Sequence, residues 1–459
     1  MTEKADIQSN TATKETPDNP ILNGVMWKAV LAFFFPILLG TFFQQLYNTV
    51  DAIIVGRFAG KVALASVGGA SAHIINLVVG FFTGLTNGCS VVISNYYGAG
   101  DKKGLDNALH TSYAFSVAGG LVLGVTCYLL TPFILTVMNT PQEIMPYAEL
   151  YIRVYFTGLM FTFIYNMGAS ILRALGDSKR PLYYLITCTI INIVLDLVLV
   201  AVFDLGVLGV ALATLVSQAV SAGLVTECLM RRTPAVKLVL RKVRFYGHIF
   251  MRMMLIGLPA GIQASTYALS NMFIQSAVNS FGVNTVAGWT AEGKVDVIFW
   301  MINGSFGVAT ATVVGQNFGA RNMERVKKGT RTCLIMALTS AIVISILLYN
   351  FGEYMLLIFC TEKAVVDIGA HLIRLLVPGY AFFVFIEIFS SSLRARGDTL
   401  IPTAINLLCI VGFRLRWVFA FGKTGSLDTI IYCYPLSWIL CMVVMTVYYI
   451  FRTRKLHAV

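Results

Sequence analysis

The sequence predicts an all-α membrane protein with twelve transmembrane helices in two pseudo-symmetric six-helix lobes. Hydrophobic residues make up 57% of the chain and charged residues only 12%, whereas a soluble domain carries about 25% charged residues. Apolar runs of about 20 residues, enough to cross a bilayer as a helix, recur along almost all 459 residues. A membrane β-barrel would instead show alternating segments of about 10 residues, so helical spans are favoured.

Twelve apolar segments can be assigned along the chain. They cover residues 30–56, 64–96, 107–130, 147–171, 181–203, 207–230, 250–280, 284–317, 329–350, 367–393, 401–421 and 427–451. A polar tail at 1–24 is expected to be disordered and cytoplasmic. The remaining chain is expected to form an N-lobe at 25–230 with helices 1–6, a basic cytoplasmic linker at 231–247, and a C-lobe at 248–459 with helices 7–12.

The two halves repeat at one constant offset. ILRALGDSKRP at 171–181 matches SLRARGDTLIP at 392–402, and NYYGAGD at 95–101 matches QNFGARN at 316–322, with the same offset in both pairs. Each half holds six spans, an even number, so both halves enter the membrane from the same side. Some transporters use such parallel repeats and bind their substrate between the lobes. In the LRAxGD loops we expect a structural role: a helix end, a turn at glycine, an aspartate cap and a proline start.

The basic residues are placed by membrane topology. The net charge is +12, but Lys and Arg gather in alternate loops, while the loops near 131–149, 204–206 and 282–286 have none. This is the positive-inside pattern. It predicts a multi-pass protein of the cell membrane with both termini cytoplasmic, and no nucleic-acid partner. The nine cysteines show no CxxC spacing, so neither a zinc site nor a disulfide framework is indicated.

The first span carries a polar stripe that ends in an aspartate. Thr41, Gln44, Asn48 and Asp51 follow at spacings of 3, 4 and 3 residues, which places them on one helix face. A carboxylate in a membrane helix costs about 2.5–3.5 kcal/mol on insertion scales and usually faces a protein interior or an aqueous cavity. We therefore expect this stripe to face a cavity that the other helices build.

Two further spans carry polar side chains at a similar height. Asn192 and Asp196 lie one turn apart on the fifth span, and Thr214 and Gln218 one turn apart on the sixth. At about 1.5 Å per residue, Asp196 and Thr214 each lie roughly 10 Å below the outer ends of their spans. Ionised carboxylates there could bind a small cation with oxygen ligands, and a protonated carboxyl group could carry H⁺. The other possibility is that these groups only pair with one another or with the backbone.

These residues and motifs resemble those of the multidrug and toxic compound extrusion (MATE) transporters, over nearly the whole chain. The resemblance rests on Pro36, Gln44 and Asp51 in the first span, the paired LRAxGD loops, VVGQNFGA at 313–320, and NIVLDLVL followed by LGVLGVALAT at 205–214. It implies export of organic, often cationic, compounds in exchange for H⁺ or Na⁺.

The resemblance also assigns roles to residues. The N-lobe cation site of prokaryotic members matches Asp51, Asn192, Asp196 and Thr214, which would bind H⁺ or Na⁺. The candidate substrate-binding residues are Gln44, Asn48, Asn166, Gln263 and Glu387. The C-lobe sodium site of some members needs acidic residues on the seventh and tenth helices, but the seventh span here has none. Coupling through the N-lobe is therefore favoured.

Charged residues inside the C-lobe spans leave alternatives open. Glu387 in the tenth span, with Arg414 and Arg416 in the eleventh, suits either a substrate contact or gate, or a buried ion pair between neighbouring helices. Glu292 and Asp296, one turn apart in the eighth span, are interpreted as a solvated entrance or a local pair.

The predicted function is a secondary active exporter that works by alternating access, without a cofactor and as a monomer. The alternative is a flippase for a lipid-linked precursor, which would need a wide cationic cavity. A membrane enzyme is disfavoured because no HExxH, GxSxG or GxxxxGK[ST] motif occurs. The expected partners are small organic molecules and the lipid bilayer.

Overall fold

The computed structural model describes residues 19–138, 140–422 and 425–455, and in these ranges the chain is almost entirely helical. The N-lobe is built from α2 (Met26–Ile54) continued by η1 (Val55–Ala59) and α3 (Gly60–Gly68), α4 (Ala70–Gly98), α5 (Lys102–Val137), α6 (Met145–Thr157) with α7 (Leu159–Ala174), α8 (Lys179–Asp196) with η2 (Leu197–Val202), and α9 (Gly206–Arg231).

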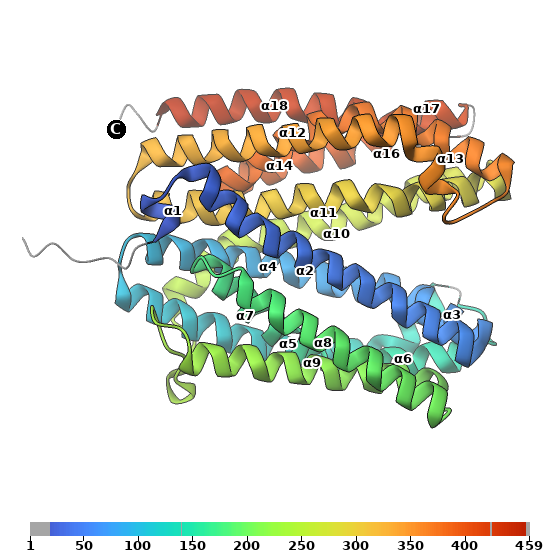
Figure 1. Cartoon of the computed structure of the whole chain (residues 1–459), viewed down its shortest axis with the longest axis horizontal. Coiled ribbons are helices and arrows are strands. Elements are labelled where there is room, and N and C mark those ends of the chain that lie inside the picture. The colour runs from blue at the N-terminus through green and yellow to red at the C-terminus, as the bar shows by residue number, and fades with distance from the viewer. Residues whose placement is uncertain (1–18, 139, 423–424, 456–459) are drawn as a thin grey trace, which may run out of the picture.

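The C-lobe repeats this order. It is built from α10 (Gly247–Asn279), α11 (Val283–Gly319), α12 (Met323–Leu356), α13 (Lys363–Leu376) with η4 (Val377–Gly379) and α14 (Tyr380–Ala395), α15 (Leu400–Asn406) with η5 (Leu407–Gly412) and α16 (Phe413–Phe421), and α17 (Leu427–Ile431) with α18 (Cys433–Lys455). Figure 1 shows the two lobes as separate bundles of roughly parallel helices.

The described residues form twelve helical stretches that are long enough to cross a membrane, as the sequence predicts. Ten are long and apolar enough to span on their own, and α6 and α7, bent by 50°, together form another. The twelfth is α10, which has 33 residues and carries the polar side chains of Gln263, Asn271 and Gln275. The first stretch is longer than expected, because α2 continues through η1 and α3 as far as Gly68.

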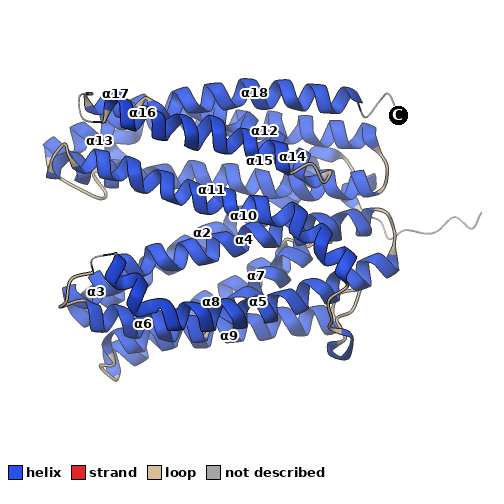
Figure 2. Ribbon diagram, turned by 180° about the vertical axis from the view of Figure 1, so that it is seen from behind, coloured by secondary structure: helices blue, strands red, loops and turns tan. Residues whose placement is uncertain are grey.

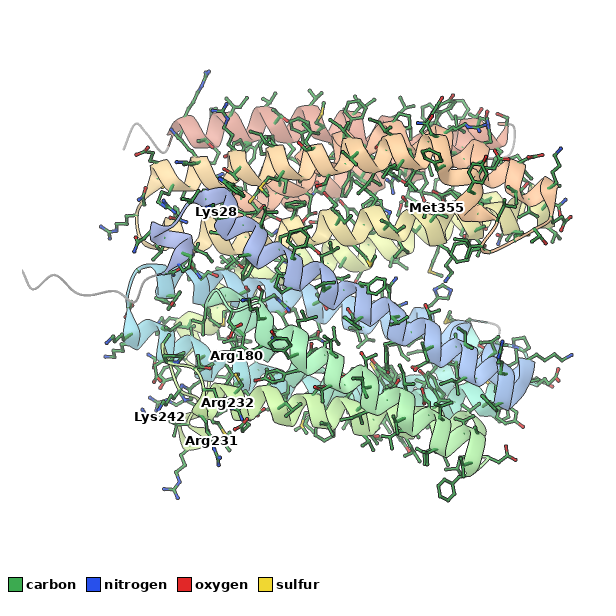
Figure 3. The ribbon with its side chains drawn as sticks, viewed as in Figure 1. Lys28, Arg180, Arg231, Arg232, Lys242 and Met355 are labelled. Carbon is green, nitrogen blue, oxygen red and sulfur yellow. The ribbon has the colours of Figure 1, made fainter. Side chains whose placement is uncertain are left out.

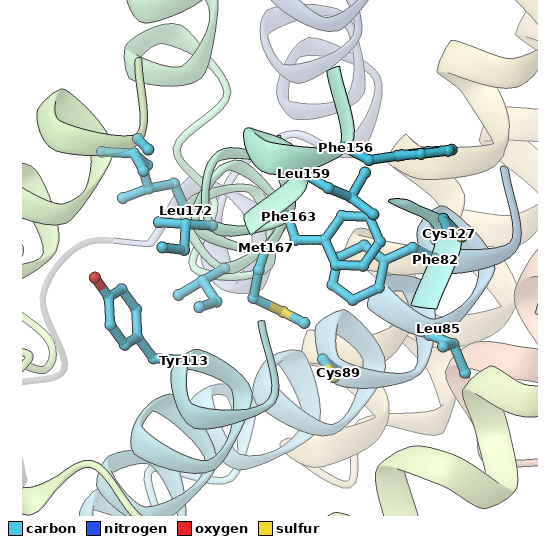
Figure 4. Close-up of a cluster of buried hydrophobic side chains, with 14 of the residues drawn as sticks. Phe82, Leu85, Cys89, Tyr113, Cys127, Phe156, Leu159, Phe163, Met167 and Leu172 are labelled. Carbon is cyan, nitrogen blue, oxygen red and sulfur yellow. The ribbon is translucent and has the colours of Figure 1, made fainter. Parts of the chain in front are cut away.

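Each lobe has its own hydrophobic core. In the N-lobe core, drawn in Figure 4, the rings of Phe82 on α4 and Phe163 on α7 stack with their centroids 3.4 Å apart. In the C-lobe core, the rings of Phe299 on α11 and Tyr380 on α14 stack at 4.0 Å. Large aromatic side chains bury much apolar surface, so each bundle has an independent packing centre.

The first helix of each lobe lies across the seam between the lobes. Met26 and Val30 of α2 are buried in the C-lobe core, and Ile249 and Met253 of α10 are buried in the N-lobe core. Figure 1 shows α2 along the seam on one face, and the view from behind in Figure 2 places α10 at the seam. The lobes thus exchange helices symmetrically, and any rocking of one lobe against the other must move α2 and α10.

The lobes converge at the end where the termini lie and diverge toward the end where α3 and α13 lie (Figure 1). At the converging end, Gly98 of α4 packs directly on the backbone of α11, and Gly319 of α11 packs on the backbone of α4. A side chain at either glycine would overlap main-chain atoms of the other lobe, so glycine makes this close approach possible.

The N-terminal segment is docked rather than free. Residues 1–18 of the expected disordered tail lie outside the described residues, but α1 (Pro20–Asn23) is helical. Nη2 of Arg325 donates hydrogen bonds of 2.9 Å and 3.0 Å to the carbonyls of Ile21 and Gly24. The expectation of disorder up to residue 24 is therefore wrong for this turn, because the C-lobe supplies partners that the local sequence does not reveal.

The LRAxGD loops turn at glycine as expected. Gly176 and Gly397 have φ values of 93° and 87°, a region that glycine adopts without steric cost. Asp177 caps α8, since its Oδ1 accepts hydrogen bonds of 3.1 Å from two backbone N–H groups. In the C-lobe, Asp398 instead accepts from the side chains of Tyr448 and Arg452, so the two loops differ in how their aspartates are held.

Candidate functional site

The N-lobe brings two carboxyl groups from different helices together. Asp51 near the end of α2 and Asp196 at the end of α8 are 7% and 0% exposed, and their carboxyl groups lie within hydrogen-bonding reach of each other. Neither oxygen of Asp196 has a hydrogen-bond partner among the described residues, nor does Oδ1 of Asp51. Two buried acceptors that face each other need a proton or a cation between them.

The neighbouring polar groups extend this site. Asn192, one turn before Asp196 on α8, is fully buried, and both its amide oxygen and its amide nitrogen lack a partner in the described part of the chain. Thr214 on α9 is 3% exposed. The predicted set of Asp51, Asn192, Asp196 and Thr214 is thus buried on α2, α8 and α9, and α8 packs against both of the other two helices.

Tyr47 is a member of the site that the sequence reasoning missed. Its hydroxyl donates a hydrogen bond of 3.2 Å to Oγ1 of Thr214 and also lies within reach of Asp51. The available signal was its position four residues before Asp51 on a helix, which puts both side chains on one face. Tyr47 links α2 to α9 beside the carboxyl pair.

Asp51 and Asp196 each lie close to a short π-helical segment of their span. The π-helical segment η2 follows directly after Asp196, and the π-helical segment η1 begins four residues after Asp51. Such segments interrupt the regular hydrogen-bond ladder and occur often at functional sites. Both carboxylates therefore stand where their helices change winding.

The donor set fits a small hard cation or a proton. Carboxylate, amide and hydroxyl oxygens are the ligands that hard cations such as Na⁺ prefer, by analogy with Ca²⁺ and Mg²⁺. Within the described ranges, no three His, Cys, Asp or Glu side chains converge on one point, as the usual transition-metal centre would require. A single small cation, or one proton shared by Asp51 and Asp196, matches the orphaned oxygens.

A second polar region lies between the lobes. A cavity of about 440 Å³ is lined by α4, α10 and α14, with Gln263, Tyr267, Glu387 and Arg394 among its residues. A smaller chamber of about 80 Å³ shares Asn87, Glu387 and Arg394 with it. Two of the predicted substrate residues, Gln263 and Glu387, thus line one interlobe cavity, whose volume falls in the range of small-molecule sites.

The other predicted substrate residues lie elsewhere. Gln44 and Asn48 are exposed on α2 and do not line either of these chambers. Asn166 is half-buried on α7, where its amide donates a hydrogen bond of 2.9 Å to the carbonyl of Thr162. Gln44, Asn48 and Asp51 follow one another along α2 at helical spacing. However, Asp51 is buried, whereas the side chains of Gln44 and Asn48 are exposed.

The charged residues of the C-lobe form two separate groups. Oε1 of Glu387 lies 3.8 Å from Nη2 of Arg394 on its own helix, so the structure does not show the alternative of an ion pair with a neighbouring helix. Arg414 is buried over the rings of Tyr434 and Trp438, and Arg416 is exposed. A substrate contact remains open for Glu387 alone.

Of the two acidic residues on α11, Glu292 is buried and Asp296 is half-buried, so the alternative of a solvated entrance does not fit Glu292. Glu292 is 2% exposed, and its Oε1 has no partner among the described residues. Asp296 accepts hydrogen bonds from the hydroxyl of Tyr380 and, at 2.5 Å, from Nε1 of Trp300. The fixed donors hold Asp296 within an aromatic cluster of the C-lobe.

Comparison with known proteins gives one consistent result. The sequence model of the family described as MatE matches residues 36–198 and 259–418, which lie in the two lobes. The chain is 28% identical over 439 residues to YoeA of Bacillus subtilis (strain 168), named a probable multidrug resistance protein, with 94% of this chain and 95% of that protein covered.

Two solved structures have the same fold. One, described as a MOP superfamily transporter from Pyrococcus furiosus whose binding pocket of reverse polarity suggests a different function, has a TM-score of 0.90 and 22% identity, covering 96% of this chain and 99% of that chain. The other, described as the outward-facing conformation of a multidrug resistance MATE family transporter, has a TM-score of 0.89 and 23% identity, covering 97% and 99%.

Proposed function

The chain belongs to the MatE family of multidrug and toxic compound extrusion transporters, and we propose that it is a secondary active exporter that exchanges organic, often cationic, compounds for H⁺ or Na⁺. The family consists of transporters rather than enzymes. The observation that carries the coupling proposal is the buried pair of Asp51 and Asp196, because three of their four carboxyl oxygens have no hydrogen-bond partner among the described residues.

The proposed cycle couples this pair to the first helix. When H⁺ or Na⁺ binds between Asp51 and Asp196, it draws α2 and α8 together and shifts α2, which contains Pro36 within its length. Because α2 also packs in the C-lobe core, its shift changes the contact between the lobes and reduces the space for substrate. The cation acts only through its differential affinity for the two arrangements.

The proposed orientation places the converging end of the lobes in the cytoplasm. Figure 3 shows Arg180, Arg231, Arg232 and Lys242 gathered at that end, away from Met355. Cytoplasmic loops carry the excess of Lys and Arg in membrane proteins. Both termini would then be cytoplasmic, and the structure would correspond to a state closed toward the cytoplasm.

The driving force is large enough for concentrative export. A gradient equivalent to about 150 mV supplies roughly 3.5 kcal/mol per charge. Since each 1.4 kcal/mol corresponds to about tenfold in concentration, one coupling ion can sustain a substrate gradient of roughly 300-fold. One cation site is therefore sufficient for useful efflux.

The test is transport against a concentration gradient. The purified full chain is reconstituted in liposomes, and movement of a fluorescent organic cation is followed under an imposed pH gradient, an imposed Na⁺ gradient, or neither. We expect uphill movement under one gradient and none without it. Movement that is independent of both gradients, or absent with folded protein, would contradict the proposal. The relatives do not favour a flippase for a lipid-linked precursor.

A further inference from the structure

The interlobe cavity carries one arginine that has no acidic partner among the described residues. Three charged side chains line its two chambers. Glu387 and Arg394 on α14 line both, and Arg173 on α7 lines the smaller one. Two positive charges and one negative charge leave the lining with a net charge of +1. This balance is unexpected for a cavity that takes only cationic compounds.

The opposite charges of Glu387 and Arg394 form an ion pair that Ser391 bridges. Their side chains lie 3.8 Å apart, and Ser391 stands between them, donating 3.1 Å to Oε1 of Glu387 and accepting 3.4 Å from Nη2 of Arg394. The three residues are spaced along one face of α14. The C-lobe thus contains a complete acid–hydroxyl–guanidinium set.

The N-lobe contains the same set without its acid. In the internal repeat, Arg173 and Ser170 correspond to Arg394 and Ser391, and both line the smaller chamber. The residue that corresponds to Glu387 is Asn166, whose neutral amide is bonded back to its own helix. Within the described residues, Arg173 has no carboxylate partner, and its titratable neighbour is the phenol of Tyr165.

The position of Arg173 at a helix end does not explain this difference. A cation in the last turn complements the helix dipole, and Arg173 and Arg394 both occupy the last turns of their helices. The dipole therefore accounts for both arginines equally. A guanidinium held in a membrane protein without a counter-ion is costly, and a transient anionic partner would remove that cost.

We propose that Arg173 binds an acidic group of the transported substrate, so that the cavity selects drug-sized organic molecules that carry a carboxylate. The carboxylate of the substrate would pair with Arg173 in the N-lobe, as the carboxylate of Glu387 pairs with Arg394 in the C-lobe. Arg is suited to this because its planar guanidinium can bind a carboxylate through two parallel hydrogen bonds. The inference deepens the proposed export function and names the substrate class of the same cavity.

The test uses three dyes with one aromatic core and the purified full chain in detergent. Rhodamine B carries a free carboxylate, its methyl ester lacks that charge, and fluorescein has the carboxylate without amino groups. Binding is measured by fluorescence anisotropy for the wild type, Arg173→Gln and Arg173→Lys. Arg416→Gln, which removes an exposed arginine on α16 outside the cavity, is the matched control.

We expect the wild type to prefer rhodamine B over its ester by roughly tenfold, the value of a hydrogen bond to a charged group. Arg173→Gln should abolish this preference, Arg173→Lys should keep part of it, and Arg416→Gln should keep all of it. Tight binding of fluorescein would support recognition of the acid alone. If rhodamine B binds and fluorescein does not, the result would support recognition of a zwitterion whose positive group also contacts Glu387.

A second variant keeps the proposal testable if Arg173→Gln does not fold. Asn166→Glu supplies the acid that the N-lobe lacks, so it should pair with Arg173 and weaken rhodamine B binding while the arginine stays in place. Equal affinity for the acid and the ester in the wild type, or no binding of any dye to folded protein, would overturn the proposal. Because binding in detergent needs no gradient, intact acid recognition without gradient-driven transport would contradict only the antiport proposal.

Discussion

The side chain of Gln316, in the C-lobe, donates a hydrogen bond of 2.8 Å to the backbone carbonyl of Ala174, in the N-lobe. The repeat supplies the reverse contact, because Asn95 and Ala395 are the residues that correspond to Gln316 and Ala174 in the other half. Asn95 donates a bond of 3.2 Å to the carbonyl of Ala395, in the amide orientation that satisfies both of its polar atoms. All four residues are buried. Opening this end of the molecule must therefore break two related hydrogen bonds.

The first prediction concerns this pair of amides. Gln316→Leu removes one of the two bonds and leaves the carbonyl of Ala174 with only the longer bond of 3.4 Å from the hydroxyl of Ser94, at a cost of about 0.5–1.5 kcal/mol. The converging end should then open more often. Hydrogen exchange should rise in the last turns of α4 and α11 and stay unchanged at the ends of α3 and α13.

Thr339→Val is the matched control, because Thr339 is exposed on α12 and, within the part of the chain that the structure describes, its hydroxyl bonds only to the carbonyl of Ile335 on its own helix. It should leave the exchange pattern unchanged. If Gln316→Leu exchanges like the wild type, these amides do not hold the lobes together.

The second prediction concerns the glycines at the same end. Gly98→Ala or Gly319→Ala places a methyl group against main-chain atoms of the other lobe, and such overpacking typically costs about 1–3 kcal/mol. Both variants should unfold at a lower temperature than the wild type in a calorimetric scan.

Gly293→Ala is the control on the same helix as Gly319. A methyl group at Gly293 meets no atom within 4 Å, and alanine favours a helix interior over glycine by about 0.5–1 kcal/mol. This variant should unfold at the same temperature or slightly higher. A shared decrease in all three variants would mean that the close approach of the lobes is not the cause.

The third prediction concerns Tyr47. Tyr47→Phe removes the hydroxyl that bonds Thr214 and reaches Asp51, at a cost of about 1 kcal/mol. Because the carboxyl pair stays, transport should continue. The hydroxyl beside Asp51 stabilises the empty, ionised carboxylate, so without it the coupling ion should bind more tightly and reach half-maximal rate at roughly fivefold lower concentration. Tyr183→Phe, at an exposed tyrosine of α8, should transport like the wild type. An unchanged ion dependence in Tyr47→Phe would exclude Tyr47 from the site.

The fourth prediction concerns the acidic residues of the C-lobe. If coupling resides in the N-lobe, Glu292→Gln and Asp296→Asn should retain gradient-driven transport, measured in the same liposomes. Asp296→Asn should lower the unfolding temperature, because Tyr380 and Trp300 donate to its carboxylate. Loss of gradient-driven transport in folded Glu292→Gln would place coupling in the C-lobe.

The fold could be predicted closely from the sequence. Twelve apolar runs and a repeat at one constant offset are strong signals, because span length and repeat spacing follow directly from bilayer thickness and symmetry. The exchange of α2 and α10 between the cores was not predicted, since burial of Met26 or Met253 depends on which bundle lies beside a helix. The docked turn at Pro20–Asn23 depends likewise on Arg325, which is far from Ile21 in the sequence.

The candidate site could be predicted in part. The rise of a helix gives the depth of a side chain in the membrane, so Asp51, Asp196 and Thr214 could be placed at one height. It does not give the direction in which a side chain points. Gln44 and Asn48 were therefore expected in a cavity, but they are exposed on α2. One of the two alternatives for Glu387 was an ion pair with a neighbouring helix, but its partner is Arg394 on its own helix. The asymmetry that leaves Arg173 without an acid could be read from the repeat only after Glu387 and Arg394 were seen together.

The central claim is that coupling passes through the N-lobe carboxyl pair. Its most direct test is uphill movement of a fluorescent organic cation in liposomes under the gradient that drives the wild type, repeated with Asp196→Asn. Asparagine has nearly the same shape but neither carries the proton nor supplies the charge. We predict that Asp196→Asn folds and inserts normally yet loses gradient-driven transport. Uphill transport at the wild-type rate in this variant would contradict the claim.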